Sequence, residues 1–254
     1  RIKKIHLVVA VSEMLLIVLK EFTMSINLLQ GDCLELMKDI PDGSVDAIIT
    51  DLPYGTTACK WDSVIPFDLM WEQLNRIIKP NGAIVLFGSQ PFTSALIMSN
   101  PKMFKCEWIY NKKVPSNFGA AKFQPMKYHE NIIVFSKKRH NYYPIKEERH
   151  GGGKQRQKYN FNNGKVGEFM NMKNKISLCK DDLRFPSSVQ IFNNKSKGNV
   201  GIHPTQKPIA LMEYLIKTYS NEGETVLDFT MGSGSTGVAC VNTKRNFIGI
   251  ELDD

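Results

Sequence analysis

A glycine-rich turn near the end of the chain most constrains its fold. An apolar strand is predicted at residues 225–229, followed by Gly232, Gly234 and a helix from about Thr236. Glycines in such a turn let the backbone approach a ligand closely, and the N-terminus of the following helix presents a partly positive charge to that ligand. Only 17 of the 254 residues follow Gly237, too few for the other strands that such a unit needs. Those strands must come from upstream, as in a circularly permuted sheet.

Apolar strands alternate with helices along most of the chain. The predicted strands are residues 27–29, 45–50, 83–87, 105–110, 130–136, 225–229 and 247–250, and the predicted helices are residues 33–39, 68–79, 92–99, 208–219 and the segment from about 236. The helix at 68–79 is expected to stop at Pro80-Asn81-Gly82. This alternation predicts an α/β fold with a doubly wound, mostly parallel sheet that binds ligands at the carboxyl ends of its strands.

The periodicity stops between residues 140 and 199, which we interpret as an insertion. From Lys137 to Lys197 there are 15 Lys and Arg against 5 Asp and Glu, a net charge of +10 within a chain of net charge +8. The segment also carries aromatic residues, namely Tyr142, Tyr143, Tyr159, Phe161 and Phe169. This mixture suits phosphate contacts and base stacking, so we predict that the insertion contacts nucleic acid. The alternative is a solvated charged loop.

The remaining composition restricts compartment and chemistry. Residues 1–23 contain an apolar run that is interrupted by Glu13 and is too short to span a bilayer, so they are expected to be extraneous or a peripheral helix, with no membrane association. Five cysteines are widely spaced and form no C-x-x-C pair. We therefore expect no metal site, no disulfide framework and a cytoplasmic location.

A second motif, Asp51-Leu52-Pro53-Tyr54, follows the buried strand at 45–50. It places a carboxylate, a rigid turn with exposed carbonyls and an aromatic face at one strand end. An aniline-like amino group is a poor nucleophile because its lone pair is delocalised into the ring. Hydrogen bonds to Asp51 and to a carbonyl of the turn at Pro53 would free that pair, while Tyr54 would stack on a base rotated out of a duplex. Alternatively, Asp51 caps the turn and Tyr54 packs in the core.

Glu251 lies one strand after the glycine turn, at the sequence distance expected of a carboxylate that binds a ribose. The turn also satisfies the G-x-G-x-x-G pattern of nicotinamide dinucleotide domains, and a plain structural turn is a further alternative. A dinucleotide domain normally opens with this pattern, whereas here it closes the chain. Its position therefore argues against a dinucleotide.

Four segments together resemble a known family. They are Gly31-Asp32, Asp51-Leu52-Pro53-Tyr54-Gly55, His203-Pro204-Thr205-Gln206-Lys207-Pro208 and Asp228-Phe229-Thr230-Met231-Gly232-Ser233-Gly234. Their order is similar to that of the β-class DNA amino-methyltransferases of the D-P-P-Y type, found in phages and restriction-modification systems, and the resemblance runs from about Asn27 to the end. It implies a Rossmann-like S-adenosylmethionine-dependent methyltransferase acting on double-stranded DNA, with adenine N6 favoured over cytosine N4.

The resemblance also implies roles for individual residues and segments. The methionine part of the cofactor would be surrounded by Asp228, Phe229, Thr230, Gly232, Ser233 and Gly234. Glu251 would bind the ribose, Asp32 would lie near the adenine, and Thr205 and Lys207 would lie near the carboxylate end. Residues 24–139 would be the catalytic half, 140–199 the target-recognition insertion and 200–254 the cofactor-binding half. A homodimer and a cognate endonuclease stay open.

The chain departs from the family pattern at Leu52, which replaces a proline and weakens the choice between adenine and cytosine. It also ends just after Glu251, so the cofactor-binding half is expected to be truncated. No Pro-Cys dipeptide is present, so covalent C5-cytosine methylation has no obvious nucleophile. Rival hypotheses are an RNA or protein amino-methyltransferase and a non-catalytic DNA-binding module.

The resemblance implies that S-adenosylmethionine binds, and the late position of the glycine motif together with its pairing with Asp51 predicts that NAD does not. Isothermal calorimetry with each compound measures this directly. Heat from NAD together with no response to S-adenosylmethionine would overturn the cofactor assignment.

Overall fold

The computed structural model describes residues 24–56, 62–148, 183–193 and 206–252, which fall into two compact units. The smaller unit is Pro144–Ser187, and the rest of the chain forms the main unit. Within the smaller unit, β6 (Glu147–Glu148) pairs antiparallel with β7 (Leu183–Arg184). The predicted insertion at 140–199 is longer than this unit at both ends, because residues 140–143 and 188–193 group with the main unit.

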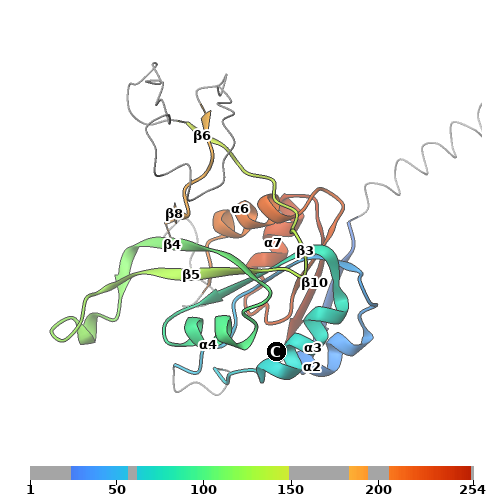
Figure 1. Ribbon diagram of the computed structural model, residues 1–254, viewed down its shortest axis with the longest axis horizontal. Coiled ribbons are helices and arrows are strands. Elements are labelled where there is room, and N and C mark those ends of the chain that lie inside the picture. The colour runs from blue at the N-terminus through green and yellow to red at the C-terminus, as the bar shows by residue number, and fades with distance from the viewer. Residues whose placement is uncertain (1–23, 57–61, 149–182, 194–205, 253–254) are drawn as a thin grey trace, which may run out of the picture. The chain divides into compact units, whose positions relative to one another are not determined.

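The main unit is built on an eight-stranded sheet in the order β1-β10-β9-β2-β3-β5-β4-β8 (Figure 1). The strands are β1 (Ile26–Gln30), β2 (Val45–Thr50), β3 (Ile78–Gly88), β4 (Phe104–Ser116), β5 (Lys127–Phe135), β8 (Val189–Ile191), β9 (Thr225–Asp228) and β10 (Asn246–Glu251). From β1 to β3 all neighbours are parallel, and β5 is antiparallel to both β3 and β4. The predicted α/β fold with a mostly parallel sheet is therefore confirmed.

The last two strands of the chain lie in the middle of this parallel region. β9 pairs with β2 through Ala47↔Val226 and Ile48↔Leu227, and β10 pairs with β1. Strands from the start and the end of the sequence thus complete one sheet. This is the permuted order that the late position of the glycine turn predicts.

Helices cover both faces of the sheet. They are α2 (Cys33–Leu36), α3 (Phe67–Ile77), α4 (Phe92–Ser99), α6 (Ile209–Tyr219) and α7 (Ser235–Asn242), with short 3-10 turns η1 (Met37–Asp39) and η2 (Phe118–Ala120). Ile48 packs in the layer of α3 and α4, whereas its neighbour Ile49 packs in the layer of α6 and α7. Successive strand side chains face opposite layers, which explains the continuous apolar runs. No helix among the described residues has the length and apolar character needed to cross a bilayer.

The predicted end of the helix at 68–79 is wrong. Helix α3 ends at Ile77, and strand β3 begins at Ile78 and continues through the expected stop at residues 80–82. Ile78 pairs with Val45, and the register then shifts before Ala47 pairs with Ala83. Pairing with a neighbouring strand therefore overrides the local turn signal.

Helix α7 packs closely on β10 at Gly237, the third glycine of the motif. A Cβ atom at this position would lie 2.8 Å from Cε1 of the buried Phe247 ring. We predict that Gly237→Ala lowers the free energy of unfolding by about 1–3 kcal/mol through overpacking. Gly119→Ala is the matched control, since a Cβ there meets nothing within 4 Å. Equal urea midpoints for the two variants would contradict this close packing.

Candidate active site

Parallel strands β1, β10, β9 and β2 all end at the same edge of the sheet. Asp51 directly follows β2, and Glu251 is the last residue of β10. Thr230 follows β9, and Asp32 follows β1. Residues that are up to 219 positions apart in the sequence are therefore brought to one edge, where α/β sheets bind their ligands.

The glycine turn after β9 borders open space at this edge. Gly232 and Gly234 have φ values of +50° and +75°, and a Cβ on either would meet nothing within 4 Å. The Gly232 N–H donates to Glu251 Oε2 at 2.6 Å, which fixes the carboxylate beside the turn. Exposed backbone next to a held carboxylate fits the ribose and methionine parts of a nucleoside cofactor.

Acidic groups also gather at the start of α2. Asp32 caps this helix and accepts from the Leu34 N–H at 2.7 Å, while the Gly31 N–H donates to the Glu251 carbonyl at 2.8 Å. Burial, together with the Asp32 and Glu251 carboxylates, raises the pKa of the Cys33 thiol to about 11. Both predicted carboxylates therefore act on the same side chain, and Cys33 stays a thiol near neutral pH.

Asp228 and Phe229 lie beneath the surface of the glycine turn. Both are buried, and Phe229 belongs to the core layer of α3 and α4. The Asp228 carboxylate accepts from the Thr236 hydroxyl and from the Thr230 N–H, so it organises the turn from inside. Burial raises its pKa to about 7. Ser233 lies half-buried in the turn, and Thr205 lies outside the described residues.

On the other side of the edge, Asp51 is held by two partners. Its Oδ1 accepts from the Tyr54 hydroxyl at 2.6 Å, and its Oδ2 forms an ion pair with Lys207. The Tyr54 ring lies 5.2 Å from the Phe92 ring between centroids. Burial and the neighbouring Asp51 carboxylate raise the pKa of Tyr54 well above its ordinary value, so its hydroxyl remains a donor.

Lys207 connects Asp51 to a second carboxylate. Its Nζ lies 3.2 Å from Glu130 Oε2, and Lys112 Nζ lies 3.1 Å from Glu130 Oε1. Burial alone would lower the pKa of Lys207, but Asp51 and Glu130 raise it above its ordinary value. Burial would likewise raise the pKa of Glu130, yet Lys207 and Lys112 hold it below its ordinary value. The cluster therefore consists of two cations shared among carboxylates.

The turn containing Asp51, Pro53 and Tyr54 is anchored by Asp62. This buried carboxylate accepts from the Gly55 and Thr56 N–H groups at 2.8 Å each. Gly55 has a φ of +67°, which favours glycine. Asp62, Glu130 and Lys112 were not identified from the sequence. The one available signal was a carboxylate at the head of the apolar strand at 130–136.

The family model for DNA methylases of the N6/N4 type matches residues 45–254. The match covers both the Asp51 edge and the glycine turn. The chain therefore belongs to this DNA methylase family, whose methyl donor is S-adenosylmethionine.

Individual relatives agree with this assignment. The Type II methyltransferase M.HpaI of Haemophilus parainfluenzae is 28% identical over 246 residues, which cover 89% of this chain and 70% of that protein. M2.MboI of Moraxella bovis is 27% identical over 253 residues, which cover 89% of this chain and 83% of that protein. Among solved structures, the M1.HpyAVI–SAM complex is 28% identical with a TM-score of 0.60, covering 90% of this chain and 94% of that one. The cytosine-N4-specific PvuII DNA methyltransferase shares the fold, with a TM-score of 0.62 at 16% identity, over 91% of this chain and 83% of its own.

The raised pKa of Asp228 predicts how stability depends on pH. The folded state holds this proton up to about pH 7, whereas an unfolded aspartate releases it near pH 4. The wild-type free energy of unfolding should therefore fall as pH rises from 5 to 8, by on the order of 2–3 kcal/mol from this group. Asp228→Asn has no proton to lose and should lack this contribution.

Urea unfolding of both proteins across that pH range measures the difference. Thr236→Val is a second variant, because the Thr236 hydroxyl lowers the pKa of Asp228. Without this hydroxyl the pKa of Asp228 should rise further, so the fall in the free energy of unfolding should extend to higher pH. Parallel stability profiles for wild type and Asp228→Asn would contradict the assignment.

Proposed function

We propose that this DNA methylase transfers a methyl group from S-adenosylmethionine to the N6 amino group of adenine in double-stranded DNA. The observation that supports it most is the direct link between the two motifs. The Thr230 hydroxyl donates to the Asp51 carbonyl at 3.0 Å, and the Phe229 N–H donates to the Thr50 hydroxyl at 3.3 Å. A ligand at the glycine turn and a group bonded to Asp51 would therefore be neighbours.

The residues at the glycine turn fit the cofactor. We assign Glu251 to the ribose hydroxyls, the backbone of Gly232 and Gly234 to the methionine part, and Asp32 to the vicinity of the adenine. When bound, S-adenosylmethionine supplies a methyl group on a positively charged sulfur, which is a strong electrophile. Asp228 and Phe229 support this surface from below.

Asp51 prepares the amino group for attack. Its carboxylate accepts a hydrogen bond from one amino N–H, and a backbone carbonyl of the turn at Pro53 accepts a hydrogen bond from the other. The lone pair of the nitrogen then becomes available for attack. The nitrogen–methyl bond would form as the sulfur–methyl bond breaks, leaving a neutral thioether, and the nitrogen would then release one proton to solvent by way of the Asp51 carboxylate. Asp51 stabilises the positive charge that develops there. Tyr54 and Lys207 hold the carboxylate in place until the amino group arrives.

Leu52 does not disturb this arrangement, because its side chain is buried in the core. It is 4% exposed and packs in the core layer of α3 and α4. The departure from D-P-P-Y therefore leaves Asp51 and Tyr54 with their mutual hydrogen bond. Cytosine N4 is the second candidate target, since its amino group offers the same two protons to the same acceptors.

The relatives suggest a biological setting. M.HpaI and M2.MboI are Type II methyltransferases, and we infer that this chain modifies DNA in a comparable system, with an endonuclease of the same specificity. The basic segment at residues 140–199 would contact the duplex and select the site. Its phosphate contacts would position the protein, while base-edge contacts would specify the sequence.

Asp51→Asn separates chemistry from binding. The amide keeps the shape but loses the charge that stabilises the transition state, so single-turnover transfer to DNA should slow about a hundredfold or more. Cofactor affinity by calorimetry should stay unchanged. Transfer at the wild-type rate by the folded variant would remove Asp51 from the mechanism.

Glu251→Gln is the matched variant at the other side of the edge. The amide still accepts from the Gly232 N–H, but the charge-assisted ribose bond is weakened. Cofactor affinity should fall by roughly tenfold or more, in line with about 1.5–3 kcal/mol for a hydrogen bond to a charged group. Transfer at saturating cofactor should change much less. An unchanged dissociation constant would show that Glu251 does not touch the cofactor.

A further inference from the structure

Strands β4 and β5 continue past the rest of the sheet as a two-stranded arm, residues 112–128. Gly88, the last residue of β3, pairs with Asn131, and β8 ends opposite Asn111. Beyond these points β4 and β5 have only each other as strand partners among the described residues. Because β3 runs parallel to β2, the arm projects from the edge that carries Asp51. Figure 1 shows it as the long green hairpin.

The arm is basic throughout. It contains Lys112, Lys113, Lys122 and Lys127 and no acidic residue. Lys112 is neutralised by Glu130, whereas Lys113 and Lys122 are exposed and Lys127 is half-buried. Lys113 and Lys122 are thus left to attract a polyanion, whereas the Lys127 ammonium donates to the Ser89 hydroxyl.

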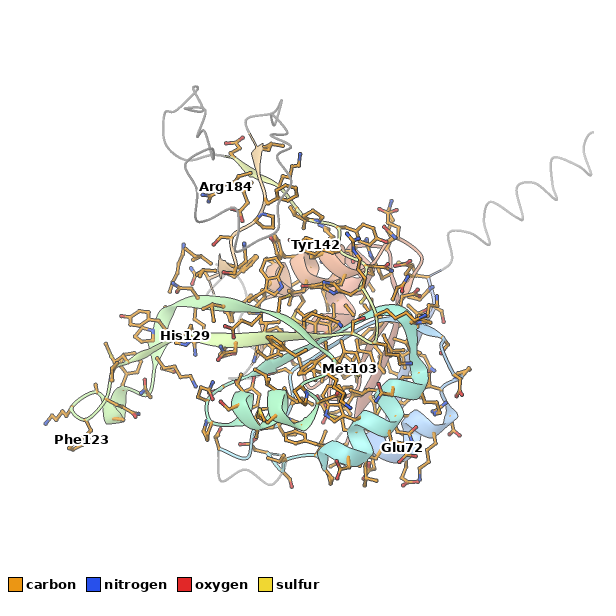
Figure 2. All side chains as sticks on the ribbon, in the orientation of Figure 1. Glu72, Met103, Phe123, His129, Tyr142 and Arg184 are labelled. Atoms are coloured by element: carbon orange, nitrogen blue, oxygen red, sulfur yellow. The ribbon has the colours of Figure 1, made fainter. Side chains whose placement is uncertain are left out.

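The tip of the arm also exposes aromatic rings. Phe123 is 89% exposed and Phe118 is 64% exposed. Figure 2 shows Phe123 at the far end of the hairpin, pointing away from the sheet. Large apolar groups that gather at an exposed place commonly mark a binding surface.

This exposure occurs on an ordered tip. Asn117 adopts a φ of +62°, and its Oδ1 accepts from the Lys127 N–H at 2.8 Å. The Ala120 N–H donates to the Asn117 carbonyl at 3.0 Å, and the Phe123 N–H donates to the Ala120 carbonyl at 2.9 Å. The two rings are therefore presented by a fixed turn, so little ordering is needed on binding.

We propose that the arm is a second DNA-binding element, which grips the duplex beside the target base. Lys113 and Lys122 contact phosphates, and Phe118 and Phe123 lie against bases or between base steps. The assignment rests on the proposed function, because a duplex that delivers a base to Asp51 must pass along the edge from which the arm projects. The four residue-to-residue steps from Asn131 to Lys127 give a reach of about 13 Å, which spans several base steps.

A second copy of this chain fits the arm less well than DNA. Outside residues 137–197 the chain carries a net charge of only about −2 (+8 − 10), so a second copy offers the lysines of the arm little complementary charge. DNA complements both features of the arm, because its phosphates attract the lysines and its stacked bases contact the phenylalanine rings.

Two double variants test the proposal in the full-length protein. Fluorescence anisotropy with a fluorescein-labelled duplex of mixed sequence, over a series of salt concentrations, gives affinity and salt dependence. Lys113→Gln with Lys122→Gln should lower the slope of log affinity against log salt by about two. Phe118→Ala with Phe123→Ala should weaken binding about tenfold or more, with the slope retained.

Each control changes one exposed residue outside the arm, a lysine in the first and a large apolar residue in the second. Lys217→Gln lies in the last turn of α6, and Met98→Ala lies near the end of α4. Both controls should bind duplex as wild type does. Circular dichroism and cofactor calorimetry should be unchanged in all variants, because the altered side chains are exposed and lie outside the cofactor turn.

Unchanged affinity and slope in both arm variants would overturn the proposal. It would also be overturned if light scattering showed that the phenylalanine variant turns a dimer into a monomer while its DNA affinity stays the same, because the arm would then bind a second copy. Failure of the proposed function has a different signature. In that case wild type binds duplex but transfers no methyl group to it, and the anisotropy comparison still stands.

Discussion

The parallel pairing of β9 with β2 is the constraint on which the site depends. It joins segments 179 residues apart and is secured at both ends. At the start of the strands, the Asp46 carboxylate accepts from the Thr225 N–H at 3.0 Å. At the end, the Thr230 hydroxyl holds the Asp51 carbonyl. Without this pairing the glycine turn and the Asp51 turn would be two unrelated strand ends.

Charge balance around Lys207 is the second constraint on the site. Lys207 is shared by Asp51 and Glu130, and Lys112 completes the pairing of Glu130. Buried charges are tolerated when each has such partners, and removing one partner is costly. If an amino group displaced Lys207 from Asp51, Lys207 would still pair with Glu130, so its charge would not be left without a partner. The site can therefore exchange one partner of Asp51 without dismantling the cluster.

The sequence predicted the elements that have a local signal. The apolar strands β2, β9 and β10, the glycine turn and the placement of Asp51 and Glu251 at strand ends follow from patterns within a few residues. The end of α3 and the length of β4 were missed, because pairing with distant strands decides both. Glu130 could not be assigned to the site, since only the antiparallel entry of β5 brings it to Lys207. Burial of Asp228 likewise depends on packing between layers.

Transfer of labelled methyl groups from S-adenosylmethionine to DNA reports both the reaction and the base that receives the methyl group. The wild-type protein is incubated with unmethylated genomic DNA, the DNA is digested to nucleosides, and the label is located by chromatography. We expect the label to elute with N6-methyldeoxyadenosine. Label in N4-methyldeoxycytidine would keep the chemistry of Asp51 but reject adenine as the target. Label in neither nucleoside, from a protein that binds both cofactor and duplex, would contradict the account.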